Sequence, residues 1–168
     1  DKASGKVAWS VAIEGSEPHA QPWLGALAVE GERVFVGAAN KKVYCLDAAS
    51  GQIRWSYEMS DWIRSAPAAS GELVYAASID GAIVCLKDGG KQATAVWQGR
   101  VDDQRIFCNL LLKNGRLYVL SEDHFLFAVN PGDGSTLWKH SLIECIYRDG
   151  ERILLDVRGG SANSAVAA

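Results

Sequence analysis

The chain has 168 residues, of which 48% are apolar and 22% are charged, and its formal net charge at pH 7 is −3. This balance is typical of a folded globular protein with a core of its own. An acidic chain offers no basic face to a phosphate backbone, so we predict no nucleic-acid binding. No apolar run approaches the roughly 18–20 residues of a membrane helix, so we expect no direct membrane insertion.

Short β-branched and aromatic segments recur along the chain in the same order. The first copy covers residues 31–55, the second starts at Gly71, the third covers 114–138, and a fourth starts at Asp149 and is incomplete. Each copy has a Gly-containing turn, a short apolar run, a polar turn and a second apolar run. In the clearest copies that second run ends in Asp or Asn and is followed by a strand that carries Trp.

A further apolar run precedes each copy, at 23–29, 62–69, 106–112 and 142–147. The sequence thus has four short strands in every 40 residues or so, and no helical periodicity is sustained. Four-stranded units of this length cannot bury both faces alone, and they stack radially as propeller blades. We therefore predict an all-β propeller of four-stranded antiparallel blades, with about four blades in this chain.

Four of the six tryptophans, Trp9, Trp55, Trp97 and Trp138, recur at intervals of 46, 42 and 41 residues. The segment V-Y-C-L-D-A-A-S-G-Q-I-R-W at 43–55 is similar to the form V-Y-A-L-D-A-x-T-G-x-x-x-W. It resembles the tryptophan-docking repeat of pyrroloquinoline quinone (PQQ) propellers, and 1–9, 83–97 and 130–138 match it in part. This family contains quinoprotein dehydrogenases and a non-enzymatic lipoprotein type that assists outer-membrane protein assembly.

The resemblance implies structural roles for the recurring tryptophans, which pack between neighbouring blades in the family. We expect this docking role for Trp9, Trp55, Trp97 and Trp138. Asp47 closes a turn by accepting backbone N–H groups. Cys45 and Cys85 occupy the same place in successive copies, and we expect both to be small buried residues without a disulfide.

We predict a single propeller domain over 1–168. Its blades cover 20–58, 62–101, 105–141 and 142–168, and residues 1–13 close the last blade as its outer strand. Four units fit three arrangements: a closed four-bladed ring, a homodimer that completes an eight-bladed ring, or a piece of a longer eight-bladed protein.

Catalytic signatures are absent from the sequence. The family's dehydrogenases hold PQQ with a calcium ion, often beside adjacent cysteines, and this chain has no adjacent cysteines. Asp61, Asp102, Asp103 and Glu144 fall on loops at the expected central face but form no recognisable ligand motif, and calcium needs six to eight oxygens. We predict no cofactor, no metal site and no enzyme activity, with PQQ and calcium as the alternative.

A cluster of charged and aromatic residues marks the expected partner-binding loops. Asp61, Trp62 and Arg64 precede one inner strand, and Asp102, Asp103 and Arg105 precede the next. Trp62 and Arg64 can grip an anionic or planar ligand. The competing interpretations are that Trp62 is a core residue and that 102–103 is a solvated turn.

The function we predict is a non-catalytic scaffold that presents loops to a protein or peptide partner. One alternative is a fragment of a PQQ-dependent alcohol or sugar dehydrogenase, and another is a ligand-sensing propeller of a signalling protein. The family resemblance favours a periplasmic or otherwise extracytoplasmic location. Four cysteines without an obvious pairing leave a cytoplasmic location open.

Overall fold

The computed structural model describes residues 4–13, 26–101 and 105–142, and these form three four-stranded antiparallel sheets. Sheet 1 contains β1 (Leu27–Glu30), β2 (Arg33–Gly37), β3 (Lys42–Asp47) and β4 (Ile53–Glu58). Sheet 2 contains β5 (Ala68–Ser70), β6 (Leu73–Ala77), β7 (Ala82–Asp88) and β8 (Ala93–Arg100). Sheet 3 contains β9 (Leu111–Lys113), β10 (Arg116–Leu120), β11 (Phe125–Val129) and β12 (Thr136–Ser141).

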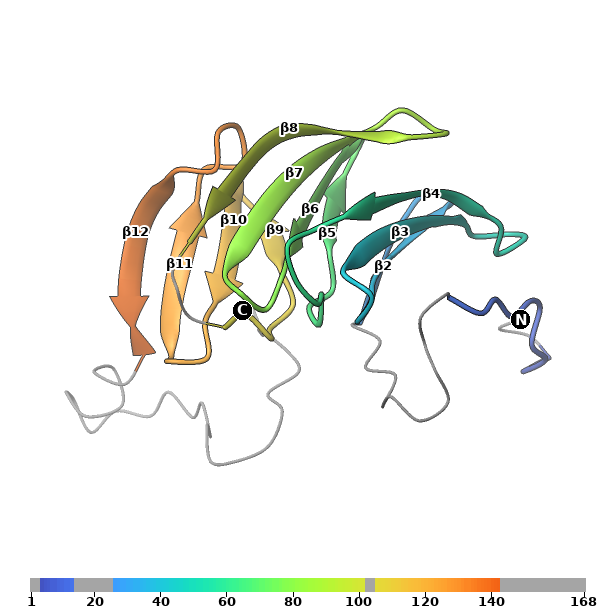
Figure 1. Cartoon of the computed structure of the whole chain (residues 1–168), viewed down its shortest axis with the longest axis horizontal. Helices are drawn as coiled ribbons and strands as arrows, with labels where there is room; N and C mark the ends of the chain where they lie inside the picture. The colour runs from blue at the N-terminus through green and yellow to red at the C-terminus, as the bar shows by residue number, and fades with distance from the viewer. Residues whose placement is uncertain (1–3, 14–25, 102–104, 143–168) are drawn as a thin grey trace.

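Each sheet is a simple meander in which consecutive strands pair, so the predicted four-stranded antiparallel repeat is confirmed. The three sheets stand side by side in chain order (Figure 1). The first strands contact one another, β1 with β5 and β5 with β9, which places the start of each repeat on a common inner side. This stacking of blades is the arrangement of a propeller.

The core follows the two-residue alternation of the strands, because successive side chains point to opposite faces of a sheet. Phe35, Val43 and Cys45 point from sheet 1 towards sheet 2, where Val74 and Val84 meet them. The other face of sheet 2 packs against sheet 3. That second cluster includes Tyr75, Ala77, Ile83, Cys85, Ile106, Leu117, Val119, Phe127 and Val129.

The repeats share local detail as well as strand order. The third strand of every sheet shifts register by one residue opposite the Trp strand, after Cys45, Cys85 and Ala128. Such a bulge increases the local twist of the strand. Cys45 and Cys85 are fully buried free thiols, as expected, and burial raises the pKa of Cys45 to about 11.

In sheets 2 and 3 the first strand is shorter than the predicted apolar run. The run 62–69 forms a strand only from Ala68, and the run 106–112 only from Leu111. The preceding residues bond to neighbouring turns instead of to a strand: Ile63 N–H donates to the Ala38 carbonyl at 3.1 Å. Pro67 has no N–H to give to a ladder.

Several predictions concern residues that the structure does not describe. The fourth blade at 142–168, Cys145 and Glu144 lie almost wholly outside the described ranges. Residues 4–13 are described and form no strand, although Trp9 packs against sheet 1. The predicted blade boundaries and the closing role of residues 1–13 therefore stay predictions. No helix in the described part of the chain is long and apolar enough to cross a membrane.

Candidate functional site

One end of the three sheets, which we call the loop face, carries the residues predicted to contact a partner. It consists of the hairpin turns 38–42, 78–82 and 121–125 and the inter-sheet connections 59–67 and 105–110. Backbone hydrogen bonds fix each connection to a turn: Met59 donates to Lys41, Ile79 to Trp62, and Glu122 to Arg105. These bonds fix the backbone of the connections to the hairpin turns.

The hairpin turns are tight, and each needs a residue with positive φ. This residue is Lys41 in sheet 1 (φ 68°), Gly81 in sheet 2 (φ 89°) and His124 in sheet 3 (φ 67°). A non-glycine residue in this region is uncommon and is tolerated where the surroundings enforce it. His124 is half-buried in this turn.

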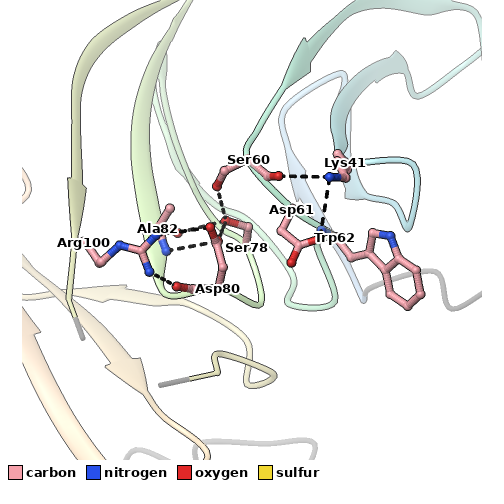
Figure 2. Close-up of polar contacts among 8 residues, drawn as sticks. All are labelled: Lys41, Ser60, Asp61, Trp62, Ser78, Asp80, Ala82 and Arg100. Carbon is pink, nitrogen blue, oxygen red and sulfur yellow. Dashed lines mark hydrogen bonds and ion pairs between the residues drawn. The ribbon is translucent and has the colours of Figure 1, made fainter. Parts of the chain in front are cut away.

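A chain of polar contacts crosses from sheet 1 to sheet 2 on the loop face (Figure 2). Lys41 Nζ donates to the Ser60 carbonyl at 3.2 Å, and Ser60 Oγ lies 3.4 Å from Ser78 Oγ. Ser78 Oγ donates to Asp80 Oδ1 at 2.6 Å, and Arg100 reaches Asp80 Oδ2 at 3.3 Å. These contacts connect sheet 1 to sheet 2 without any strand pairing between the two sheets.

Asp80 is the central charged group in this series of polar contacts. Its partial burial would raise the pKa of its carboxyl, but hydrogen bonds from Ser78 and Ser60 outweigh burial and hold the pKa below its ordinary value. Asp80 is therefore charged at neutral pH and is matched by Arg100. Asp61 has a weaker partner in Lys41, with 4.0 Å between the charged atoms, and both groups are partly exposed.

A cluster of two aromatic rings and one arginine lies beside these polar contacts. The guanidinium carbon of Arg64 is 5.8 Å from the centre of the Trp62 ring and 5.5 Å from that of Phe107. These distances suit cation–π contacts. Trp62 is 42% exposed, so the interpretation of Trp62 as a core residue is wrong. Two consecutive inter-sheet connections thus contribute to one cluster, as Ala66 N–H donation to Asn109 Oδ1 at 2.9 Å also shows.

The structure brings together part of the predicted contact set. Asp61, Trp62 and Arg64 share the 59–67 connection, and Arg105 is exposed on the next connection. Asp102 and Asp103 lie outside the described residues. Sequence reasoning missed Phe107 because it belongs to an apolar run that was assigned to a strand.

Sequence reasoning also missed the Ser–x–Asp turn. It occurs in sheet 2 as Ser78 and Asp80 and in sheet 3 as Ser121 and Asp123, with the serine hydroxyl donating to the carboxylate in both. Its repetition at equivalent positions was the signal that could have revealed it.

The opposite end of the sheets holds the tryptophan-docking contacts. Trp9 Nε1 donates to the Ala48 carbonyl at 2.9 Å, and Trp97 Nε1 donates to the Pro131 carbonyl at 2.8 Å. In both cases the accepting turn belongs to the sheet that follows the tryptophan in the chain. Trp55 follows the same direction but reaches a side chain, Asp88, at 2.8 Å.

Two further predicted docking residues lie at this end or beside it. Asp47 accepts N–H groups of Ala49 and Ser50, and hydrogen bonds from Arg54 and Ser50 hold the pKa of Asp47 below its usual range. Trp138 lies on the outward face of sheet 3 and is 37% exposed. The centres of the Trp138 and Tyr118 rings are 6.0 Å apart.

The described residues do not fit a calcium-held quinone. Across 4–13, 26–101 and 105–142, no three His, Cys, Asp or Glu side chains form a group that could hold a metal ion. On the loop face, Asp61 and Asp80 are instead matched by Lys41 and Arg100.

Comparison with known proteins identifies the family. Residues 1–144 match the family model described as outer membrane protein assembly factor BamB. The chain belongs to this family. Its sequence is 28% identical over 153 residues to quinoprotein alcohol dehydrogenase PedH of Pseudomonas putida, covering 77% of this chain and 25% of PedH. It is 27% identical over 110 residues to BamB of Burkholderia pseudomallei, covering 66% of this chain and 28% of that protein.

A solved structure supports the propeller fold. The crystal structure of BamB from Moraxella catarrhalis superposes with a TM-score of 0.61 at 22% identity, covering 70% of this chain and 37% of that one. This likeness, together with the three antiparallel sheets, establishes the PQQ-like β-propeller architecture. The chain spans about a quarter of the length of the curated relatives it matches.

Proposed function

We propose that this chain is part of a non-catalytic propeller scaffold that binds a protein or peptide partner through the loop face. The main support for this proposal is the cluster of Trp62, Arg64 and Phe107, which joins two inter-sheet connections. Trp62 is 42% exposed in this cluster. Exposed aromatic rings and arginines dominate binding energy at protein interfaces. The rigid attachment of both connections lowers the entropy lost on binding.

The contact surface in this proposal contains Asp61, Trp62, Arg64 and Arg105. We propose Asp102 and Asp103 as further contacts from the sequence alone, since they lie outside the described residues. The charges of Asp61 and Arg105 would lie around the aromatic cluster as a polar rim, which is the usual anatomy of a protein interface. The BamB relative, named as an outer membrane protein assembly factor, supports a role in protein assembly.

The test is a peptide selection followed by titration. Peptides displayed on phage are selected on the immobilised chain, and the best binder is titrated against the wild type and W62A/R64A. We expect at least a tenfold loss of affinity in the variant, because removing a hot-spot residue costs about 2 kcal/mol or more. V96A is the matched control, since Val96 is 53% exposed on β8 and lies outside the loop face. Equal binding by all three proteins would contradict the proposal.

The loss of affinity should not result from unfolding of the variants. Trp62 is exposed, so W62A is expected to change the free energy of unfolding by less than about 0.5 kcal/mol. Urea denaturation of W62A and of W62A/R64A measures this directly. A cooperative melt like that of the wild type assigns the loss of affinity to the missing contact.

A PQQ-dependent alcohol dehydrogenase is the second candidate, favoured by the likeness to PedH. Its test is incubation of the full-length gene product with PQQ and calcium, with dye reduction measured on alcohols or glucose. We expect no turnover.

We also infer an extracytoplasmic location and a ring completed by further blades, from the same polypeptide or from a second copy. Exposed apolar side chains on the two outer sheets support the completion of the ring, because further blades would cover them. Trp138 is 37% exposed on sheet 3, and Leu27 is 61% exposed on sheet 1. Light scattering tests the homodimer, because a mass near that of one chain contradicts it. Fusion to a reporter that is active only outside the cytoplasm tests the location, and an inactive fusion contradicts it.

A further inference from the structure

The interface between sheets 1 and 2, which we call the first interface, contains a buried carboxylate. Asp88 ends β7, and its side chain is only 2% exposed. Its Oδ2 accepts Arg33 Nη1 at 2.8 Å, and its Oδ1 accepts Trp55 Nε1 at 2.8 Å and Gly90 N–H at 2.7 Å. Arg33 and Trp55 both belong to sheet 1, so one carboxylate of sheet 2 holds two strands of its neighbour.

The interface between sheets 2 and 3, the second interface, lacks this pair at the equivalent positions. By strand register, the residue that corresponds to Arg33 is Leu73, and the residue that corresponds to Asp88 is Pro131, which carries no charge. There Trp97 bonds to a backbone carbonyl, which does not titrate. The two interfaces therefore share geometry but differ in charge.

The surroundings of Asp88 supply one direct counter-charge. Arg33 Nη2 also donates to the Gly71 carbonyl at 2.7 Å, which anchors the guanidinium. The other charged or titratable groups around Asp88 come from β1, β3, β4 and its own sheet: Glu30, Cys45, Arg54, Glu72 and Lys87.

The charged form of Asp88 is favoured in the folded chain. Burial would raise the pKa of its carboxyl, but hydrogen bonds from Arg33, Gly90 and Trp55 outweigh burial and hold the pKa below its ordinary value. A carboxyl whose pKa is lower in the folded state stabilises the fold above its unfolded-state pKa of about 4. That contribution is lost as the pH falls through the lower, folded-state value.

We propose that the first interface is an acid-sensitive joint: protonation of Asp88 releases Arg33 and weakens the hold on Trp55, so that sheet 1 separates from sheet 2 while sheets 2 and 3 stay packed. A proton from solvent is the only reactant. Separation would also part Ser60 from Ser78 on the loop face, where their hydroxyls lie 3.4 Å apart. Acid would thereby rearrange the loop face.

Hydrogen exchange followed by mass spectrometry tests the joint in the whole chain. Exchange is measured from pH 6 to pH 2.5 and normalised at each pH to the unfolded chain. The comparison is between β4, which carries Trp55, and β8, which carries Trp97. We expect protection of β4 to fall roughly tenfold or more below pH 4, as for loss of a hydrogen bond to a charged group, while β8 keeps its protection. Equal change in β4 and β8, or no change in either, would overturn the proposal.

A double variant provides the matched control. R33L/D88N removes both charges of the pair, with the side chain at 33 that the second interface has at 73, and the selective loss in β4 should disappear. If it persists, Asp88 is not the sensor and the proposal is wrong. D88N alone serves the same purpose should the double variant fail to fold, because asparagine keeps an oxygen for Trp55. D133N removes an exposed carboxylate from a turn of sheet 3 and should respond to acid like the wild type; if it too loses the selective response, Asp88 is not the specific sensor.

Discussion

The first and second interfaces arise from the same repeat, yet different residues stabilise them. In the first, a buried carboxylate accepts an arginine and an indole from the neighbouring sheet. In the second, an indole bonds to a backbone carbonyl, and the cluster around it includes Tyr75, Phe127 and Leu117. The comparison teaches that strand periodicity sets the geometry of a blade interface, while residues at two positions decide whether it responds to pH.

Truncation of the two docked indoles gives the largest expected difference. Trp55 is 4% exposed and Trp97 is only half-buried. We expect Trp55→Ala to lower the free energy of unfolding by about 3–5 kcal/mol, and Trp97→Ala to lower it by less, because the cost of truncation grows with burial. Urea denaturation at pH 7 measures both. A Trp97→Ala chain that is the less stable of the two would break the comparison.

Removal of Arg33 alone tests whether charge matters in the first interface. Arg33→Leu leaves Asp88 buried without its direct partner, and we expect a loss of about 3 kcal/mol. Adding Asp88→Asn should restore most of that loss, because an uncharged amide does not need the guanidinium. Denaturation of the single and double variants at pH 7 gives the coupling. Additive losses would show that the pair is not coupled.

The glycines of the docking turns separate backbone strain from steric overlap. Gly134 (φ 77°) and Gly90 (φ 84°) both adopt left-handed backbone, but a Cβ on Gly134 would lie 2.6 Å from the Trp97 ring, whereas a Cβ on Gly90 meets nothing within 4 Å. We expect Gly90→Ala to cost about 1–2 kcal/mol from backbone strain. Gly134→Ala should cost more, and equal thermal melting shifts would contradict the Trp97 stacking.

The smallest expected effect is a change in the free energy of unfolding at alkaline pH, and it concerns Tyr75 in the second interface. Burial of the Tyr75 phenol raises its pKa to about 12. A raised pKa contributes stability that is complete below the unfolded value of about 10 and is lost as the pH rises through the folded value. We therefore expect the free energy of unfolding to fall less between pH 9 and pH 11 in Tyr75→Phe than in the wild type. Parallel curves would contradict this.

The strand repeat was readable from the sequence because each blade folds from consecutive residues. The turns with glycine, the alternation around Cys45 and the spacing of the tryptophans all report local structure. The pairing of Arg33 with Asp88 was not readable, because these residues are 55 positions apart and the turn after Asp88 differs from its counterparts. Which acceptor Trp55 reaches depends on that turn.

The candidate site was predicted less completely than the fold. Asp61, Trp62 and Arg64 were found as a local cluster, but Phe107 joins them only because the two inter-sheet connections lie side by side. Backbone bonds to the hairpin turns keep both connections out of the ladders, and Pro67 adds to this in the first. Strand-forming propensity does not reveal either effect.

The central claim is that the tryptophans hold sheets together and that the loop face binds a partner without chemistry. The most direct test is dye reduction by the full-length gene product with PQQ, calcium and an alcohol. The account predicts no calcium-dependent turnover, with the same background for wild type and W62A/R64A. Turnover that requires calcium and is lost in W62A/R64A would contradict it.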